Sequence, residues 1–409
     1  MPDAPPHVTI PTSAHDRKDI SPGPLSGVVV ADFTRILAGP YCTMLLADMG
    51  ATVIKVEAPS GDDSRTWIPP AREGVSTYYL AVNRNKHSIV LDLRDPADLE
   101  TAHEIVDQAD VLIENFKPGG LLRYGLDASQ TTEAHPELIH TSITGFGSGG
   151  GKNMPGYDLL VQGLSGLMSV TGSPERDPQR AGVAMFDVIT GLHAATGILA
   201  ALHERGVSGQ GQHVELDLLS SALSGLVNQT AGYAACGNVP QRLGNDHPSL
   251  YPYGPFPTAE KDLIICAGND RQFARLVSNL GFGWAAEDPR FATMEERNQN
   301  RSTLRELLVE ALSQNSAEHW FEVLQEEGIP CAPILNIGEG VQFAERLGLN
   351  PVVTAGQQSE EVPTIKHPVQ FSRTPAHYGK APPRLGADSE QVREWLLSRS
   401  RDSAQETSV

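Results

Sequence analysis

The stretch GVVVADFTRILAGPYCTMLLADMGATVIKVE, residues 27–57, predicts a strand, a loop, a helix and a second strand in that order. Residues 27–33 form a short apolar run of the kind that makes a buried strand. The apolar side chains of 44–47 continue into a helix, which we expect to end at Gly50. Residues 51–57 are the next strand candidate. Together they indicate a sheet with a helix packed against it.

The same alternation continues along the chain, with strands expected at 87–93 and 110–116 and a helix at 96–109 between them. Strands that alternate with helices predict an α/β fold, here a large Rossmann-like domain with a mainly parallel sheet. Residues 226–330 differ, because a Pro-rich polar loop precedes a strand and two charged helices, which predicts a smaller α/β domain. The expected segments are a flexible extension (1–24), the large domain (25–225), the small domain (226–330) and a C-terminal segment returning to the large domain (331–409).

The charge balance argues against nucleic-acid binding. Thirty-one Lys and Arg stand against fifty Asp and Glu, a formal net charge of -19, whereas a nucleic-acid footprint needs a surplus of positive charge. A few local cations could still hold an anionic small molecule. The four cysteines are scattered without a CxxC pair, so we expect neither a disulfide framework nor a metal site.

We expect neither a targeting segment nor a membrane-spanning segment. We expect no apolar run approaching the roughly 18 residues of a membrane span. Residues 1–24 are rich in Pro and polar side chains and lack a secretory apolar core, so we expect a flexible extension and a cytoplasmic protein.

The loops after the predicted strands bear on ligand binding. Residues 34–41 carry one glycine, whereas a dinucleotide site needs G-x-G-x-x-G, and the Gly-rich stretch 147–153 lacks a P-loop pattern and favours a flexible loop. Turn residues and cations combine at 61–67, 83–88 and 115–120, near strand ends where open α/β sheets bind ligands. The cations available for a phosphorylated ligand are Arg35, Arg65, Arg84, Lys86, Lys117 and Arg123.

Asp187 is the one acid in GVAMFDVITGLHAATG, residues 182–197, where a helix is expected to begin. One interpretation is a helix cap, since Asp is favoured at that position. The other is a nucleophile, because a partly desolvated carboxylate at the positive end of a helix stays ionised and can attack. We expect Gly182 and Gly191 to leave room for a substrate there. The residues alone leave both interpretations open.

Several stretches, in order from about residue 25 to residue 396, resemble the family III CoA-transferases; they are 32–57, 83–93, 109–120, 156–172, 186–202 and 208–219. The resemblance implies an enzyme that uses acyl-CoA as substrate, without metal or redox cofactor, in an interlocked homodimer. The stretches 61–70, 77–89, 182–192 and 267–274 are similar to the subgroup that moves CoA from succinyl-CoA to glutarate.

The resemblance also implies roles for residues. Asp187 would attack the thioester, forming an anhydride and then an aspartyl-CoA thioester. The positions implied to contact CoA are Arg35, Ile36, Ala38, Leu91, Arg94, Asn115, Phe116 and Arg123. The chain departs from formyl-CoA transferase by lacking its tetraglycine loop and by having Ala58 where that enzyme has an adenine-contacting arginine, which argues against formyl and oxalyl substrates.

A dicarboxylate acceptor keeps one carboxylate free, and arginine binds a carboxylate with two hydrogen bonds. Our candidates are Arg65, Arg84 and Arg242, with His247 as a donor, and we expect 242–254 to cover the acceptor. Tyr157 and Asp158 are also candidates for binding the substrate. Racemases of the family have a His-Asp pair at these two positions; tyrosine is a poor base at neutral pH, which favours transfer. A racemase, an intramolecular CoA transferase and an inactive CoA-binding protein stay as alternatives.

Overall fold

The computed structural model describes residues 23–357 and 360–406, so the extension expected over 1–24 lies almost wholly outside the described residues. The chain divides into two compact units. The first holds residues up to 165, 181–237 and from 350 onward; the second holds 166–180 and 238–349. These limits differ from the expected ones at 225 and 330, and the four-segment scheme stays a prediction.

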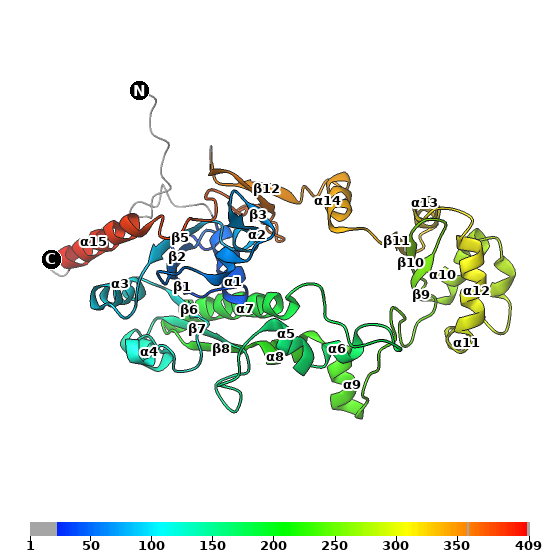
Figure 1. Cartoon of the computed structure of the whole chain (residues 1–409), viewed down its shortest axis with the longest axis horizontal. Helices are drawn as coiled ribbons and strands as arrows, with labels where there is room; N and C mark the ends of the chain where they lie inside the picture. The colour runs from blue at the N-terminus through cyan, green and yellow to red at the C-terminus, as the bar shows by residue number, and fades with distance from the viewer. Residues whose placement is uncertain (1–22, 358–359, 407–409) are drawn as a thin grey trace, which may run out of the picture. The chain divides into compact units, whose positions relative to one another are not determined.

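The first unit is built on a six-stranded sheet in the order β5-β2-β1-β6-β7-β8, with every neighbouring pair parallel (Figure 1). The strands are β1 (Val29–Phe33), β2 (Thr52–Glu57), β5 (Lys86–Val90), β6 (Val111–Glu114), β7 (Ile139–Thr144) and β8 (His213–Asp217). The α/β prediction is confirmed. Because the chain crosses from β5 back to β6 beside β1, the order reverses there, and open sheets bind ligands at such a point.

Helices cover both faces of this sheet. The helices of the first unit are α1 (Ala38–Asp48), α2 (Thr77–Ala81), α3 (Pro96–Asp107), α4 (Ala128–Ala134), α5 (Asp158–Leu164), α7 (Met185–Ser208), α8 (Leu218–Gly225), α9 (Asn228–Cys236) and α15 (Ser389–Glu406), of which α2 and α9 lie off the sheet (Figure 1). Shorter elements are the 3-10 turns Asp63–Thr66 and Leu122–Tyr124 and the two-stranded pairs β3 (Ala71–Arg72) with β4 (Val75–Ser76) and β12 (Val352–Ala355) with β13 (Val362–Ile365).

The two faces have different cores. On one, Leu112 of β6 packs in a cluster with Ile105 of α3 and Trp395 of α15. On the other lie α1 and α7: Thr43 of α1 donates a hydrogen bond to Asp32 of β1, and Val214 of β8 lies against Gly197 of α7. The sheet therefore holds α1 and α7 side by side, with their first turns near its carboxyl edge.

The second unit has a three-stranded antiparallel sheet, β11-β10-β9, with helices packed against it. Its elements are α6 (Leu167–Val170), β9 (Tyr253–Pro257), β10 (Asp262–Cys266), α10 (Asp270–Asn279), the 3-10 turn Gly283–Ala286, α11 (Met294–Gln299), α12 (Arg301–Leu312), α13 (Ala317–Glu326), β11 (Cys331–Pro333) and α14 (Ile337–Arg346). Phe256, Phe273, Leu308 and Trp320 belong to its core. Because β11 pairs with β10, the second unit extends beyond residue 330. The chain returns to the first unit after residue 349.

Within the described residues, α7 is the helix that is long and apolar enough to cross a membrane by length and composition alone. The expectation of no such apolar run did not anticipate it. α7 packs within the first unit against α1, α8, β7 and β8.

Gly191 of α7 marks the closest approach of α7 to α1. A Cβ atom at Gly191 would lie 2.6 Å from the backbone oxygen of Ala38, whereas one at Gly182 would meet nothing within 4 Å. Of the two glycines expected to leave room for a substrate, Gly191 is therefore required by helix packing.

Gly191→Ala is expected to destabilise the protein by about 1–3 kcal/mol, since backbone atoms of α1 would have to move. Gly206→Ala, on the same helix with nothing within 4 Å, serves as the matched control and should stabilise the protein by at most about 1 kcal/mol. Urea unfolding measures both free energies. Equal midpoints for the two variants would contradict the close contact.

Candidate active site

The N-terminus of α7 is capped by a residue from another helix. Asp158, the first residue of α5, accepts hydrogen bonds through Oδ1 from the backbone N–H groups of Phe186, at 2.7 Å, and Asp187, at 3.2 Å. The residue preceding α7, Ala184, has no side chain able to do this. Asp158 therefore fills the capping role that the sequence left open for Asp187, and the Asp187 carboxylate is free of it.

Gln162 fixes Asp158 in place. Its Nε2 donates to Asp158 Oδ2 at 2.6 Å and to the Val183 carbonyl at 3.2 Å, and its Oε1 accepts from the Ala181 N–H at 2.8 Å. Asp158 and Gln162 are four residues apart on α5 and so share one face of it. This amide joins the cap to the segment that leads into α7.

The Asp187 carboxyl is electrostatically unusual. Burial, together with the negative charge of Asp158, raises the pKa of Asp187 to about 7. The expectation that the helix end keeps this carboxyl fully ionised is therefore wrong, because burial outweighs the helix dipole. Within the described residues, no hydrogen bond reaches its carboxylate oxygens. A carboxylate that is desolvated and lacks hydrogen-bond donors keeps its nucleophilicity, so this group is suited to covalent chemistry.

Tyr78 of α2 is a site residue that the sequence analysis missed. Burial and the carboxylates of Asp187 and Asp158 raise the pKa of Tyr78 to about 12, so its phenol stays neutral and can donate a hydrogen bond. The neighbouring Tyr79 is instead fully buried, and its hydroxyl contacts Arg65 and the Pro383 carbonyl. The TYYL stretch holds no signal that separates the two tyrosines.

Apolar contacts bring three segments together beside Asp187. A small cluster centred on Leu37 and Leu45 also receives Ile36, Tyr78, Ala184 and Val188. The loop after β1, helix α2 and the first turn of α7 therefore meet there. The loop that the resemblance assigned to CoA therefore lies beside the first turn of α7, which carries the candidate nucleophile.

The implied CoA residues gather at the carboxyl edge of the sheet, because each follows the end of a parallel strand. Asn115, after β6, accepts a hydrogen bond from the Arg35 N–H at 3.1 Å and donates one to the Arg35 carbonyl at 2.8 Å. These bonds join the chain after β1 to the chain after β6, at the point where the strand order reverses. Arg35 and Asn115 therefore mark the position in the sheet at which this topology is expected to bind a ligand.

The other implied CoA residues differ in accessibility. Leu91 and Ala38 are buried core residues. Phe116 is half-buried against the core around α3. Arg94 is exposed and paired with Asp92, and Arg123 is exposed with its guanidinium over the ring of Tyr124. The contacts of these residues with CoA stay predictions.

Two of the three candidate acceptor arginines already have carboxylate partners. Arg84 is 2% exposed and contacts both carboxylate oxygens of Asp48. Arg65 binds Glu57 through Nε at 2.8 Å and Nη2 at 2.6 Å. A substrate role for either arginine stays a prediction, and these ion pairs speak against it.

The remaining acceptor candidates fall in different places. Tyr157 is 60% exposed at the start of α5. In the second unit, Arg242 Nε donates to the Ser173 carbonyl at 3.3 Å, and His247 Nδ1 accepts the N–H groups of Ser249 and Leu250, both at 3.1 Å. Because Nδ1 accepts, the His247 Nε2 carries the proton in the neutral ring and is the donor.

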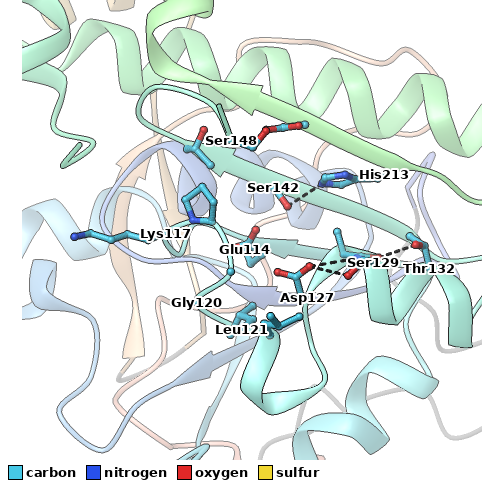
Figure 2. A pocket seen from close by; sticks show the side chains of 16 residues that line it. Glu114, Lys117, Gly120, Leu121, Asp127, Ser129, Thr132, Ser142, Ser148 and His213 are labelled. Carbon is cyan, nitrogen blue, oxygen red and sulfur yellow. Dashed lines mark hydrogen bonds between the residues drawn. The ribbon is translucent and has the colours of Figure 1, made fainter. Parts of the chain in front are cut away.

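A pocket of about 460 Å³ opens beside α4, at the carboxyl end of β6 and along β7 and β8 (Figure 2). Burial raises the pKa of Glu114 there to about 7, and the hydroxyl of Ser142 lies 3.0 Å from Nε2 of His213. Since Val214 faces α7, its neighbour His213 points to the opposite face. The pocket is therefore separated from Asp187 by the sheet. Among the described residues, no group of three or more His, Cys, Asp or Glu could hold a metal ion.

The fold and site define an α/β protein that carries a desolvated carboxylate in the first turn of a helix packed on a parallel sheet, and comparisons with known proteins name its class. The model of CoA-transferase family III matches residues 25–389, and the chain belongs to this family. The prediction of an enzyme of this class is thereby confirmed.

Three relatives are informative. A succinate–glutarate CoA-transferase of Agrobacterium fabrum is 42% identical, over 90% of this chain and 94% of its own. An acetyl-CoA:oxalate CoA-transferase of Acetobacter aceti is 37% identical, over 82% of this chain and 86% of its own. The crystal structure of a CAIB/BAIF family protein from Brucella suis has a TM-score of 0.84 and 39% identity, and the match covers 92% of this chain and all of that one.

Proposed function

We propose that this CoA-transferase moves CoA from succinyl-CoA to a dicarboxylic acid, glutarate or a close analogue, with Asp187 as the nucleophile. The observation that carries the proposal is the Asp187 carboxylate. It stands at the positive end of α7, is largely desolvated, and is released from capping because Asp158 performs that task. The subgroup resemblance and the Agrobacterium relative support the substrate pair.

The reaction proceeds by four acyl transfers. The Asp187 carboxylate attacks the succinyl carbonyl carbon, and the CoA thiolate leaves a mixed anhydride behind. The thiolate attacks the aspartyl carbonyl, which releases succinate and leaves an aspartyl-CoA thioester. Glutarate attacks that thioester to form a second anhydride and free the thiolate. The thiolate then takes the glutaryl group, giving glutaryl-CoA and the original carboxylate. Splitting the exchange in this way lowers each barrier.

Neutral donors near Asp187 assist these steps. The tetrahedral intermediates carry negative charge on the former carbonyl oxygen, and a preorganised donor stabilises such charge in a dry site. Tyr78 is the candidate donor of one such hydrogen bond, because its side chain packs in the same apolar cluster as Ala184 and Val188 and its phenol stays protonated.

The CoA phosphates require positive charge, which the carboxyl edge provides. No side chain caps the N-terminus of α1 in the described part of the chain, so its N–H groups offer partial positive charge beside the loop after β1. Arg35, Lys117 and Arg123 lie on the loops of the same edge and are exposed or half-exposed. We assign the nucleotide half of CoA to this edge.

Arg242 lies in the second unit, so its role at the free carboxylate of the acceptor stays a prediction. It has no carboxylate partner among the described residues, in contrast to Arg65 and Arg84. His247, in the same polar loop, adds a donor at Nε2.

We also propose a homodimer and a cytoplasmic location. Large apolar side chains are exposed on neighbouring helices of the first unit, among them Leu160 and Leu164 of α5, Leu192 of α7 and Leu223 of α8. Exposed apolar surface of this kind is typical of an interface between chains. The cysteines are free, which suits a reducing compartment.

Mass spectrometry of the acyl-CoA products tests the substrate assignment. Purified protein with succinyl-CoA and a panel of acids, including glutarate, itaconate and oxalate, should form glutaryl-CoA fastest. Oxalyl-CoA as the main product would overturn the acceptor assignment and favour the activity named for the Acetobacter relative. Proton exchange beside the thioester in heavy water, without any acceptor, would instead favour a racemase.

A further inference from the structure

The loop after β1 contains a strained residue. Ile36 has a φ of 74°, in the left-handed region that residues branched at Cβ rarely adopt. Such a conformation persists only where the surroundings impose it, and it is commonly found at sites of binding or catalysis. The strain therefore raises the question of what holds Ile36.

Asp62 holds it. The two carboxylate oxygens of Asp62 lie 3.2 Å and 3.1 Å from the Ile36 N–H. Oδ1 also accepts from the N–H and hydroxyl of Ser64, at 3.0 Å and 2.7 Å. Oδ2 accepts from Lys55 Nζ at 3.0 Å, and the same Nζ donates to the Thr34 carbonyl at 2.9 Å. The Lys55–Asp62 ion pair therefore holds the backbone on both sides of Arg35.

The pair is buried and charged. Asp62 is 3% exposed and Lys55 is fully buried. Burial alone would favour the neutral carboxyl, but Lys55 and the Ser64 hydrogen bonds hold the pKa of Asp62 below its usual value. Burial likewise opposes a charged Lys55, but Asp32 and Asp62 keep the pKa of Lys55 above its usual value. The anchor stays ionised across the physiological range, and charged hydrogen bonds are the stronger kind.

The anchored loop has a consequence at the reactive centre. With its backbone held, Ile36 packs in the apolar cluster that includes Tyr78, Ala184 and Val188, next to Asp187. Two residues later α1 begins, with its N-terminus uncapped in the described part of the chain. The same turn therefore sets the apolar wall of the thioester site and aims a positive helix end at the edge where CoA is expected.

We propose that Asp62, supported by Lys55, is a positioning residue for CoA, which acts by holding Ile36 in the left-handed conformation. Neither residue need touch the ligand. The inference rests on the proposed function, since it concerns the site to which CoA was assigned.

A double-mutant cycle tests it, with free CoA as the probe in calorimetry. Asp62→Asn keeps the shape and one acceptor but weakens the charged hydrogen bonds, and should weaken CoA binding about 10-fold. The KM for succinyl-CoA should rise by a similar factor, with a smaller change in kcat. In an Ile36→Gly background the same substitution should cost less than about 3-fold, because glycine adopts this φ without being held.

Asp110→Asn is the matched control. Asp110 also accepts a hydrogen bond from a backbone N–H, that of Val29 at 2.8 Å, and pairs with Arg205 at 2.8 Å. It lies at the amino-terminal end of β1, whereas Ile36 follows the carboxyl-terminal end. It should lower the thermal midpoint without changing CoA affinity. Ser64→Ala, which removes only the hydroxyl donor to Asp62, is the milder second variant, with an expected weakening of about 2–3-fold.

The outcomes separate the two proposals. If the unsubstituted protein binds CoA and Asp62→Asn and Ser64→Ala bind it equally well, the positioning role is wrong while the proposed function stands. Equal losses for Asp62→Asn with isoleucine and with glycine at position 36 would reject the link to Ile36. Failure of the unsubstituted protein to bind CoA or use succinyl-CoA would reject the proposed function and this inference together.

Discussion

Asp187→Asn is expected to lower kcat for CoA transfer by at least about 10⁴-fold, because an amide oxygen cannot form the anhydride that the first step requires. CoA binding should persist, since Asp187 is assigned to the acyl group and not to the nucleotide. Product formation from succinyl-CoA and glutarate, with calorimetry of CoA binding, measures both quantities.

Glu204→Gln is the control for this substitution, because Glu204 is an exposed acid on the same helix, far from its first turn. It should retain the activity of the unsubstituted protein. More than a hundredth of that activity in Asp187→Asn would remove Asp187 from the nucleophile role.

Because the pKa of Asp187 is raised to about 7, we expect both kcat and stability to depend on pH near that value. The nucleophile must be ionised, so kcat should fall as pH drops below about 7. Stability runs the other way: a carboxyl whose folded pKa lies above its unfolded value favours folding at low pH, and that benefit is lost as pH rises through 7. Asp187→Asn should therefore have a higher thermal midpoint than the unsubstituted protein at pH 8, with a smaller difference at pH 4.

Asp158→Ala has the second largest expected effect, a fall in kcat of about 10²–10³-fold. It removes the acceptor of the Phe186 and Asp187 N–H groups, so the first turn of α7 loses its cap and the nucleophile its orientation. Asp95→Ala is the matched control, because Asp95 caps α3 through the N–H groups of Ala97 and Asp98. It should cost comparable stability and leave kcat unchanged.

Asp158→Asn distinguishes orientation from charge. Asparagine keeps an acceptor oxygen for α7, so the rate should fall less than with alanine. Because the negative charge of Asp158 contributes to the raised pKa of Asp187, its removal should shift the acidic limb of the kcat–pH profile to lower pH. An unshifted limb, with a loss as large as that of alanine, would indicate that Asp158 takes part directly in the chemistry.

Some of the site could be anticipated from the sequence. The run 27–33 and the helix before Gly50 appear in the structure as β1 and α1, and Asp187 lies in the first turn of a helix as expected. Ion-pair partners could not be anticipated. Arg84 and Asp48 are 36 residues apart along the chain, and their pairing depends on the approach of the last residue of α1 to the segment before β5, which no local pattern specifies.

By itself, the sequence determined the alternation of strands and helices and the placement of a lone acid at a helix start, because periodicity and capping preference depend on residues close along the chain. Only the tertiary structure decided that Asp158, 29 residues upstream of Asp187, caps α7 and frees the nucleophile, and that Asp62 holds Ile36. A hydrogen bond forms with whichever group the packed sheet brings within reach, and that choice is made by the fold as a whole.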